Sequence, residues 1–127
     1  MATIKSYTDI SQSKKLAEIL PLESADMKYK EYTSSLDYSS KHCVISSVGC
    51  PHSKDLPCWS LTALLDVLPT IRKGEDIANP FISKTPDGEY YIVYATLTEE
   101  VDSSAIYDNP VDACVAMIEK LHDSNLL

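Results

Sequence analysis

The chain has 127 residues, 44% of them hydrophobic, and this length and apolar content suit a single compact domain spanning residues 1–127. No segment approaches the roughly 18 consecutive apolar residues of a membrane-spanning helix, and Met1–Ser11 lacks the apolar block of a secretory signal. These features predict a soluble cytoplasmic protein that makes no membrane contact.

Acidic residues outnumber basic ones by nineteen to eleven, and the excess is concentrated in residues 85–119. This segment contains no Lys or Arg but has eight acids, which equal the net charge of −8: Asp87, Glu89, Glu99, Glu100, Asp102, Asp108, Asp112 and Glu119. Direct nucleic-acid binding is disfavoured, because gripping a phosphate backbone needs clustered Lys and Arg. We interpret the segment as a solvated surface; the alternatives are a face that docks a basic partner and an acidic nucleic-acid mimic.

The first expected helix covers Ile10–Leu20, where Asp9 and Gln12 have the spacing of a capping box and Pro21 ends the helix. Two strands are expected after it, over Met27–Tyr32 and His42–Val48.

The second expected helix begins after Ser60, a favourable N-cap, and ends at Pro69. Trp59 stands where a hydrophobic staple to Leu64 would form. The apolar side chains recur at helical spacing and share one face: Leu61, Leu64, Leu65 and Leu68.

A β-hairpin is expected from Phe81–Thr85 and Glu89–Leu97, because Pro86–Gly88 between them is a turn signal. Its second strand is apolar or aromatic on both faces, so we expect it to be central and covered by helices on at least one side. One face carries Tyr90, Ile92 and Tyr94, and the other carries Tyr91, Val93, Ala95 and Leu97.

The third expected helix has Asn109 as N-cap, Pro110 at its first position and Asp112 in its first turn. Its buried stripe is Val111, Cys114, Val115, Ile118 and Leu121. Together the elements predict an α+β fold, in which a small antiparallel sheet of three to four strands, including the Phe81–Leu97 hairpin, packs against three helices. An apolar strand left at the edge of that sheet would invite pairing with a second copy, so a homodimer is a further expectation.

The four cysteines are too sparse for a secreted disulfide scaffold and are read as free thiols. Zinc ligation by Cys43, Cys50, His52 and Cys58 is the alternative, although their spacing lacks the close C-x2-C pair of common zinc sites. The expectation is therefore independent cysteines, with no cofactor and no metal.

Cys58 precedes a helix N-terminus, where a thiol pKa can be lowered, but no histidine has a recognisable relation to it as a general base. A packed, unreactive side chain is the favoured interpretation. The sequence also has no phosphate-binding Gly loop, nucleophile elbow or H-E-x-x-H motif, so we expect no enzymatic activity.

The chain has eight tyrosines and one phenylalanine, and three of the tyrosines lie in the expected hairpin. Because Tyr is enriched in binding patches, the hairpin is a candidate binding surface. The candidate binding residues are Tyr90, Tyr94, Glu99, Glu100 and Asp102. The alternative for the tyrosines is a place at the rim of the core, with the hydroxyl in water. The alternative for Glu99, Glu100 and Asp102 is an acidic connector, because they lack the spacing of a calcium loop.

Three blocks of sequence carry a resemblance: Ser6–Asp9 with Gln12–Leu20 and Glu23–Met27; Pro57–Leu61 with Ala63–Leu65 and Leu68–Pro69; and Tyr107–Val115 with Met117–His122. In these blocks the chain resembles a family of small uncharacterised proteins of Bacteroides-group gut bacteria and their phages and mobile elements. The resemblance implies variable stretches at residues 28–56 and 70–106 and assigns no activity or site residue.

The leading functional hypothesis is a non-enzymatic protein-interaction module that acts on a host or phage protein. A small metal-binding or thiol-dependent protein is the alternative, and an acidic nucleic-acid mimic is the third reading.

Overall fold

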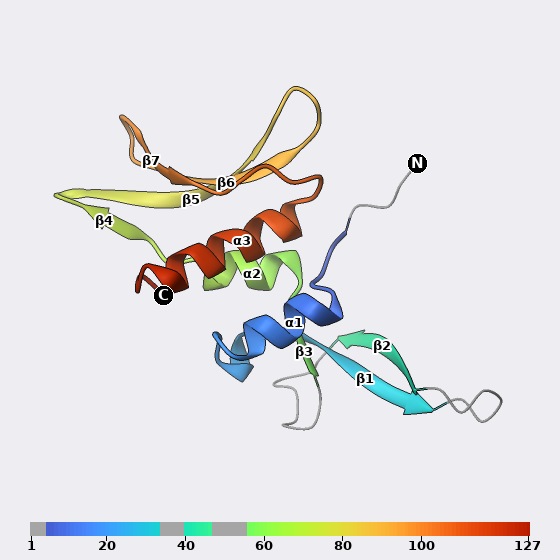
Figure 1. The fold of residues 1–127 in the computed structure, drawn as a ribbon. Helices are drawn as coiled ribbons and strands as arrows, with labels where there is room; N and C mark the ends of the chain where they lie inside the picture. The colour runs from blue at the N-terminus through green and yellow to red at the C-terminus, as the bar shows by residue number, and fades with distance from the viewer. Residues whose placement is uncertain (1–4, 34–39, 47–55) are drawn as a thin grey trace. The chain divides into compact units, whose positions relative to one another are not determined.

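The computed structural model describes residues 5–33, 40–46 and 56–127, and of residues 30–33 and 40–46 it describes the backbone alone. The elements follow one another along the chain as α1 (Ile10–Ala17), a 3-10 turn (Leu22–Ser24), β1 (Met27–Thr33), β2 (Ser40–Ser46), β3 (Leu56–Cys58), α2 (Leu61–Val67), β4 (Ile71–Lys73), β5 (Asp76–Lys84), β6 (Tyr90–Ala95), β7 (Glu100–Ser103) and α3 (Pro110–Asp123) (Figure 1). The expected α+β fold with three helices and antiparallel strands is confirmed.

The strands form two antiparallel sheets, in the orders β2-β1-β3 and β4-β5-β6-β7. The expected hairpin is the centre of the second sheet, where Phe81 lies opposite Val93 and Ile82 opposite Ile92. The first sheet forms around β1, which pairs with β2 on one side and with β3 on the other.

The described chain divides into two compact units, one of Tyr7–Ala63 and one of Lys5 and Ser6 with Leu64–Leu127. The single-domain interpretation stays a prediction.

Residues Tyr7–Ala63 contain α1 and the β2-β1-β3 sheet. The predicted capping box is present, because the Gln12 N–H donates to Asp9 Oδ1 over 2.8 Å and the Asp9 N–H donates to Gln12 Oε1 over 3.1 Å. Leu16 is fully buried, and so is Trp59, whose indole N–H donates to Ser24 Oγ over 2.9 Å. A buried indole therefore has its one donor satisfied.

The predicted caps of α2 and α3 are also confirmed. Ser60 Oγ accepts the Ala63 N–H over 3.2 Å, and Asn109 Oδ1 accepts the Asp112 N–H over 2.8 Å. The whole predicted stripe of α3 is buried: Val111, Cys114, Val115, Ile118 and Leu121, joined by Ala113 and Met117.

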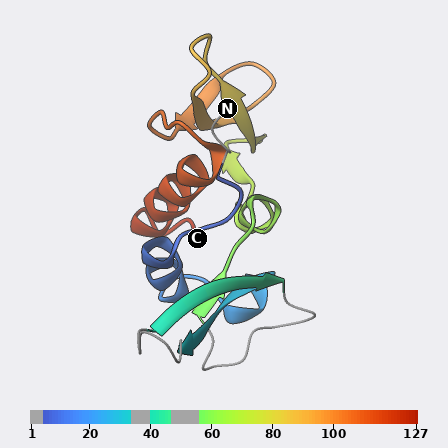
Figure 2. The same cartoon turned by 90° about the vertical axis from the view of Figure 1, so that its right-hand side faces the viewer.

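Helix α3 lies along β6, on one side of the four-stranded sheet (Figures 1 and 2). Ile92 and Tyr94 of β6 are fully buried, whereas Tyr91 and Val93 are partly exposed. Because neighbouring side chains of a strand point to opposite faces, the sheet packs one face on the helix and leaves the other face more open.

The acidic connector expected at Glu99–Asp102 is instead partly strand. Glu100–Ser103 forms β7, which pairs with β6 through an irregularity at Tyr94 and Ala95. Hydrogen bonds between Ser104 and Ile92 extend this pairing, so local charge did not prevent the segment from completing the sheet.

Among the described helices, none combines the length and apolar content that crossing a bilayer requires.

Truncating the α3 stripe should destabilise the protein. Ile118→Ala is expected to lower the free energy of unfolding by about 3 kcal/mol, because a fully buried isoleucine is replaced by a cavity. His122→Ala, at an exposed position of the same helix, should change it by less than about 0.5 kcal/mol. Urea unfolding of both variants measures the difference, and equal losses would contradict the packing described for α3.

Candidate functional site

Tyr94 belongs to the core of the protein and cannot present its ring to a partner. Its side chain is fully buried, and its hydroxyl donates to the Pro69 carbonyl oxygen over 2.6 Å. Burial raises the pKa of this hydroxyl to about 12. The candidate binding set therefore loses Tyr94, because the face of β6 that carries it packs on α3.

Tyr90 lies at the opposite end of β6 from the acidic candidates. It pairs with Lys84 across the hairpin, and the Lys84 ammonium stands 5.7 Å from the centroid of its ring. The five residue steps from Tyr90 to Ala95 span about 17 Å of strand, and Glu99 and Glu100 follow only after the next turn. The structure thus does not bring the predicted tyrosine and acids into one patch.

Two of the candidate acids have basic partners. Lys73 Nζ lies 2.9 Å from a Glu99 carboxylate oxygen, and Lys120 Nζ lies 2.6 Å from Asp102 Oδ1 and also donates to the Ser103 carbonyl. These pairs are partly exposed, so each contributes at most about 1 kcal/mol. Glu100 is exposed on β7.

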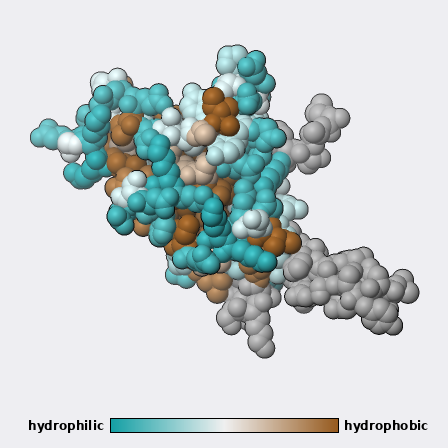
Figure 3. Space-filling view, viewed as in Figure 1, coloured by the Kyte–Doolittle hydropathy of each residue, from teal (hydrophilic) through white to brown (hydrophobic). Residues whose placement is uncertain are grey.

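The sheet face that points away from α3 carries a set of side chains that are not among the predicted binding residues. We call it the open face: Ile77, Asn79, Phe81 and Ser83 of β5, with Tyr91 and Val93 opposite them on β6. Ile77 is 50% exposed and Phe81 is 51% exposed. Figure 3 shows hydrophobic residues at the surface over this sheet, with hydrophilic ones between them.

Acidic side chains lie at both ends of the open face. We call them the acidic rim: Asp87 and Glu89 in the β5–β6 turn, Glu75 and Asp76 at the β4–β5 turn, and Glu99 and Glu100 at the β6–β7 turn. All six are exposed. An apolar centre between acidic ends is suited to a protein partner with basic margins.

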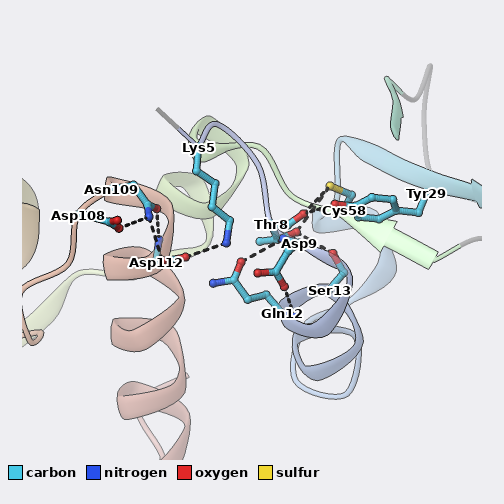
Figure 4. A network of polar contacts seen from close by, with 10 residues as sticks. All are labelled: Lys5, Thr8, Asp9, Gln12, Ser13, Tyr29, Cys58, Asp108, Asn109 and Asp112. Atoms are coloured by element: carbon cyan, nitrogen blue, oxygen red, sulfur yellow. Dashed lines mark hydrogen bonds and ion pairs between the residues drawn. The ribbon is translucent and has the colours of Figure 1, made fainter. Parts of the chain in front are cut away.

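The start of α3 is held by polar contacts within its own unit (Figure 4). Lys5 Nζ lies 2.9 Å from Asp112 Oδ1, and the Asn109 amide donates to Asp112 and to Asp108. The contacts orient the helix terminus, and their donors and acceptors are mutually satisfied.

Cys58 lies in a buried polar cluster of the other unit (Figure 4). Its sulfur is 3.6 Å from Thr8 Oγ1, which also makes a 2.8 Å hydrogen bond with Ser13 Oγ. The Tyr29 hydroxyl donates to the Thr8 carbonyl over 2.7 Å. The cluster thus ties α1 and β1 to β3 through satisfied buried groups.

The Cys58 thiol is suited to a structural role. Burial raises its pKa, and hydrogen bonds from Thr8 and Ser13 offset that rise only in part. Since the thiolate is the nucleophile, a fully buried, protonated thiol has neither the charge nor the access that a nucleophile needs.

The proposed metal ligands fall largely beyond what the structure describes. Cys50 and His52 lie outside the described residues, and Cys43 is described through its backbone in β2 alone. In the part of the chain that the structure describes, no three His, Cys, Asp or Glu side chains are grouped as metal ligands. The zinc alternative stays a prediction.

A comparison of the chain with protein-family models, curated proteins and solved structures found no match. The resemblance carried by the three sequence blocks therefore stays a prediction.

Thiol reactivity tests the burial of the two described cysteine side chains. In a Cys43→Ser, Cys50→Ser variant the native protein should release almost no chromophore with Ellman's reagent at about pH 8, because Cys58 and Cys114 are buried with raised pKa values. Both thiols should react once guanidinium unfolds the protein. Rapid reaction of either thiol in the folded protein would contradict the described core.

Stability at alkaline pH tests the buried tyrosine hydroxyls. The pKa of Tyr94 rises from 10 to about 12 on folding, so the unfolded chain releases its proton first. The free energy of unfolding should fall between about pH 10 and pH 12, and the Tyr94→Phe variant should lose part of that slope. An identical slope in the variant and the wild type would show that Tyr94 is not buried as described.

Proposed function

We propose that the chain is a non-enzymatic protein-interaction module that docks a basic protein surface on its open face. The observation that carries this proposal is the pair of half-exposed apolar side chains, Ile77 and Phe81, on a sheet face that α3 does not cover. Partly exposed Tyr91 and Val93 lie opposite Ser83 and Phe81 on the neighbouring strand. Apolar side chains gathered on a surface are typical of interaction sites.

The acidic rim supports a basic partner over an acidic one. Six exposed carboxylates flank the ends of the open face. Among the ion pairs of the described residues, one involves this acidic rim, the pair of Glu99 with Lys73. Opposite charge at the margins accelerates encounter and selects against acidic partners, while the apolar centre provides affinity. The resemblance to proteins of Bacteroides-group bacteria and their phages supports a host or phage protein as this partner.

The test compares proteins captured from a lysate of such a bacterium by two variants of equal charge. The face variant is Phe81→Ala with Glu89→Lys and Glu100→Lys; the control carries Glu18→Lys and Glu23→Lys, exposed positions outside the four-stranded sheet. Quantitative mass spectrometry should show a basic partner retained by the wild type and the control and reduced at least about tenfold by the face variant.

Two results would refute this proposal. One is the same set of captured proteins, in the same amounts, with the wild type and the face variant. The other is a captured partner whose binding is insensitive to salt, since docking between unlike charges weakens as salt screens them.

A further inference from the structure

Strand β5 has one edge that is paired over only part of its length. It runs from Asp76 to Lys84, and β6 pairs with Asn79–Lys84 on one side. On the other side β4 pairs only with Asp76–Ala78. Along Pro80–Lys84, no strand among the described residues occupies this second edge.

The backbone groups at this edge can be assigned from the hydrogen bonds around them. The Thr85 N–H donates to the Glu89 carbonyl over 2.8 Å, so Thr85 points towards the β6 side of the hairpin. Since backbone direction alternates along a strand, Phe81 and Ser83 also point towards β6, whereas Pro80, Ile82 and Lys84 point outwards. Proline has no N–H, so the outward donors are those of Ile82 and Lys84 alone.

Apolar side chains lie on both faces at the middle of this edge. Phe81 on the open face is 51% exposed, and Ile82 on the face towards α3 is 38% exposed. An edge with unpaired backbone groups and exposed apolar side chains is a template for another strand. Pro80 is tolerated there because its missing N–H would point away from β6.

We propose that a second copy of the chain pairs with this edge in antiparallel orientation, about a two-fold axis through Ile82. Ile82 then lies opposite Ile82 of the other copy, and Pro80 lies opposite Lys84. The two four-stranded sheets become one continuous sheet.

This register uses both outward N–H donors of the edge and the carbonyl oxygens of Pro80 and Ile82. The two Ile82 residues exchange both of their hydrogen bonds, and each Lys84 N–H donates to the Pro80 carbonyl of the other copy. Pro80 has no N–H to donate, so the Lys84 carbonyl opposite it stays with solvent at the end of the paired segment. The outward residues Pro80, Ile82 and Lys84 all take part, whereas a shift of two residues in either direction leaves one of them beyond the pairing.

The same axis places like side chains against one another, as an isologous interface requires. The two Ile82 side chains are directly opposite on the face towards α3. On the open face the two Phe81 rings are diagonal neighbours, at a separation that aromatic side chains bridge. Pairing therefore covers both exposed apolar groups of the edge at once.

Charge gives this pairing a distinctive salt dependence. Each copy carries a net charge of −8, so the two copies repel one another. Added salt screens that repulsion and should strengthen the dimer, whereas it should weaken docking of a basic partner. Pairing needs no other protein, so its failure and failure of the proposed docking are separately observable.

Sedimentation equilibrium of the purified full chain tests the proposal at about 5 to 500 µM protein, in low and high NaCl. The wild type should form a dimer that tightens as NaCl rises. Ile82→Lys should raise the dissociation constant at least about 100-fold, because it places two like charges directly opposite. Ile77→Lys, a half-exposed isoleucine of β5 beyond the paired segment, should change it less than about threefold.

Circular dichroism establishes that each variant is folded. If Ile82→Lys is unfolded, the Lys84→Pro variant is used in its place. The Lys84 N–H points outwards and makes no intrachain backbone hydrogen bond among the described residues, so its removal should spare the monomer. Lys84→Pro should weaken the dimer by removing two of its four hydrogen bonds. A wild-type chain that is monomeric at every concentration and salt level would overturn the proposal, and so would a dimer that Ile77→Lys disrupts as strongly as the edge variant.

Discussion

Packing of α3 on the buried face of β6 is the constraint on which the four-stranded sheet depends. Ile92 and Tyr94 are fully buried on the strand, and Ile118 and Leu121 are fully buried on the helix. A helix buries one stripe and covers one face of a sheet. The opposite face of the sheet, and the edge of β5 along Pro80–Lys84, are left to solvent or to a partner. The proposed docking face and the proposed dimer both arise from this asymmetry.

The surface ion pairs contribute little to the stability of this helix–sheet packing. Lys73 with Glu99 and Lys120 with Asp102 are partly exposed pairs that salt screens. The other exposed carboxylates of the acidic rim lie at the two ends of an apolar centre, which favours some partners over others. The buried polar cluster at Cys58 has the opposite character, because its groups are desolvated and mutually hydrogen-bonded, and it specifies local structure.

The helices could be predicted because their signals are local. Asp9, Ser60 and Asn109 cap helices through contacts three residues away, and the α3 stripe follows from spacing alone. The hairpin was predictable for the same reason, from a turn that includes Gly88, whose φ of 83° suits glycine.

The short strands and the candidate site were harder to predict than the helices, because they depend on long-range pairing. Strands β3, β4 and β7 have three or four residues and form against partners already in place. Both faces of β6 are apolar in sequence, so alternation could not reveal that Tyr94 packs on α3 while Val93 faces outwards. Pro80 was an available signal for an edge strand, but the predicted hairpin began only at Phe81.

Solvent access to isoleucine methyl groups tests the one-sided packing most directly. In a protein labelled at the isoleucine δ1 methyls, a soluble gadolinium chelate should broaden the NMR signal of Ile77 strongly and leave those of Ile92 and Ile118 nearly unchanged, because the first is half exposed and the other two are fully buried. Broadening of Ile92 and Ile118 as strong as that of Ile77 would contradict the account, since it would mean that α3 does not cover the sheet.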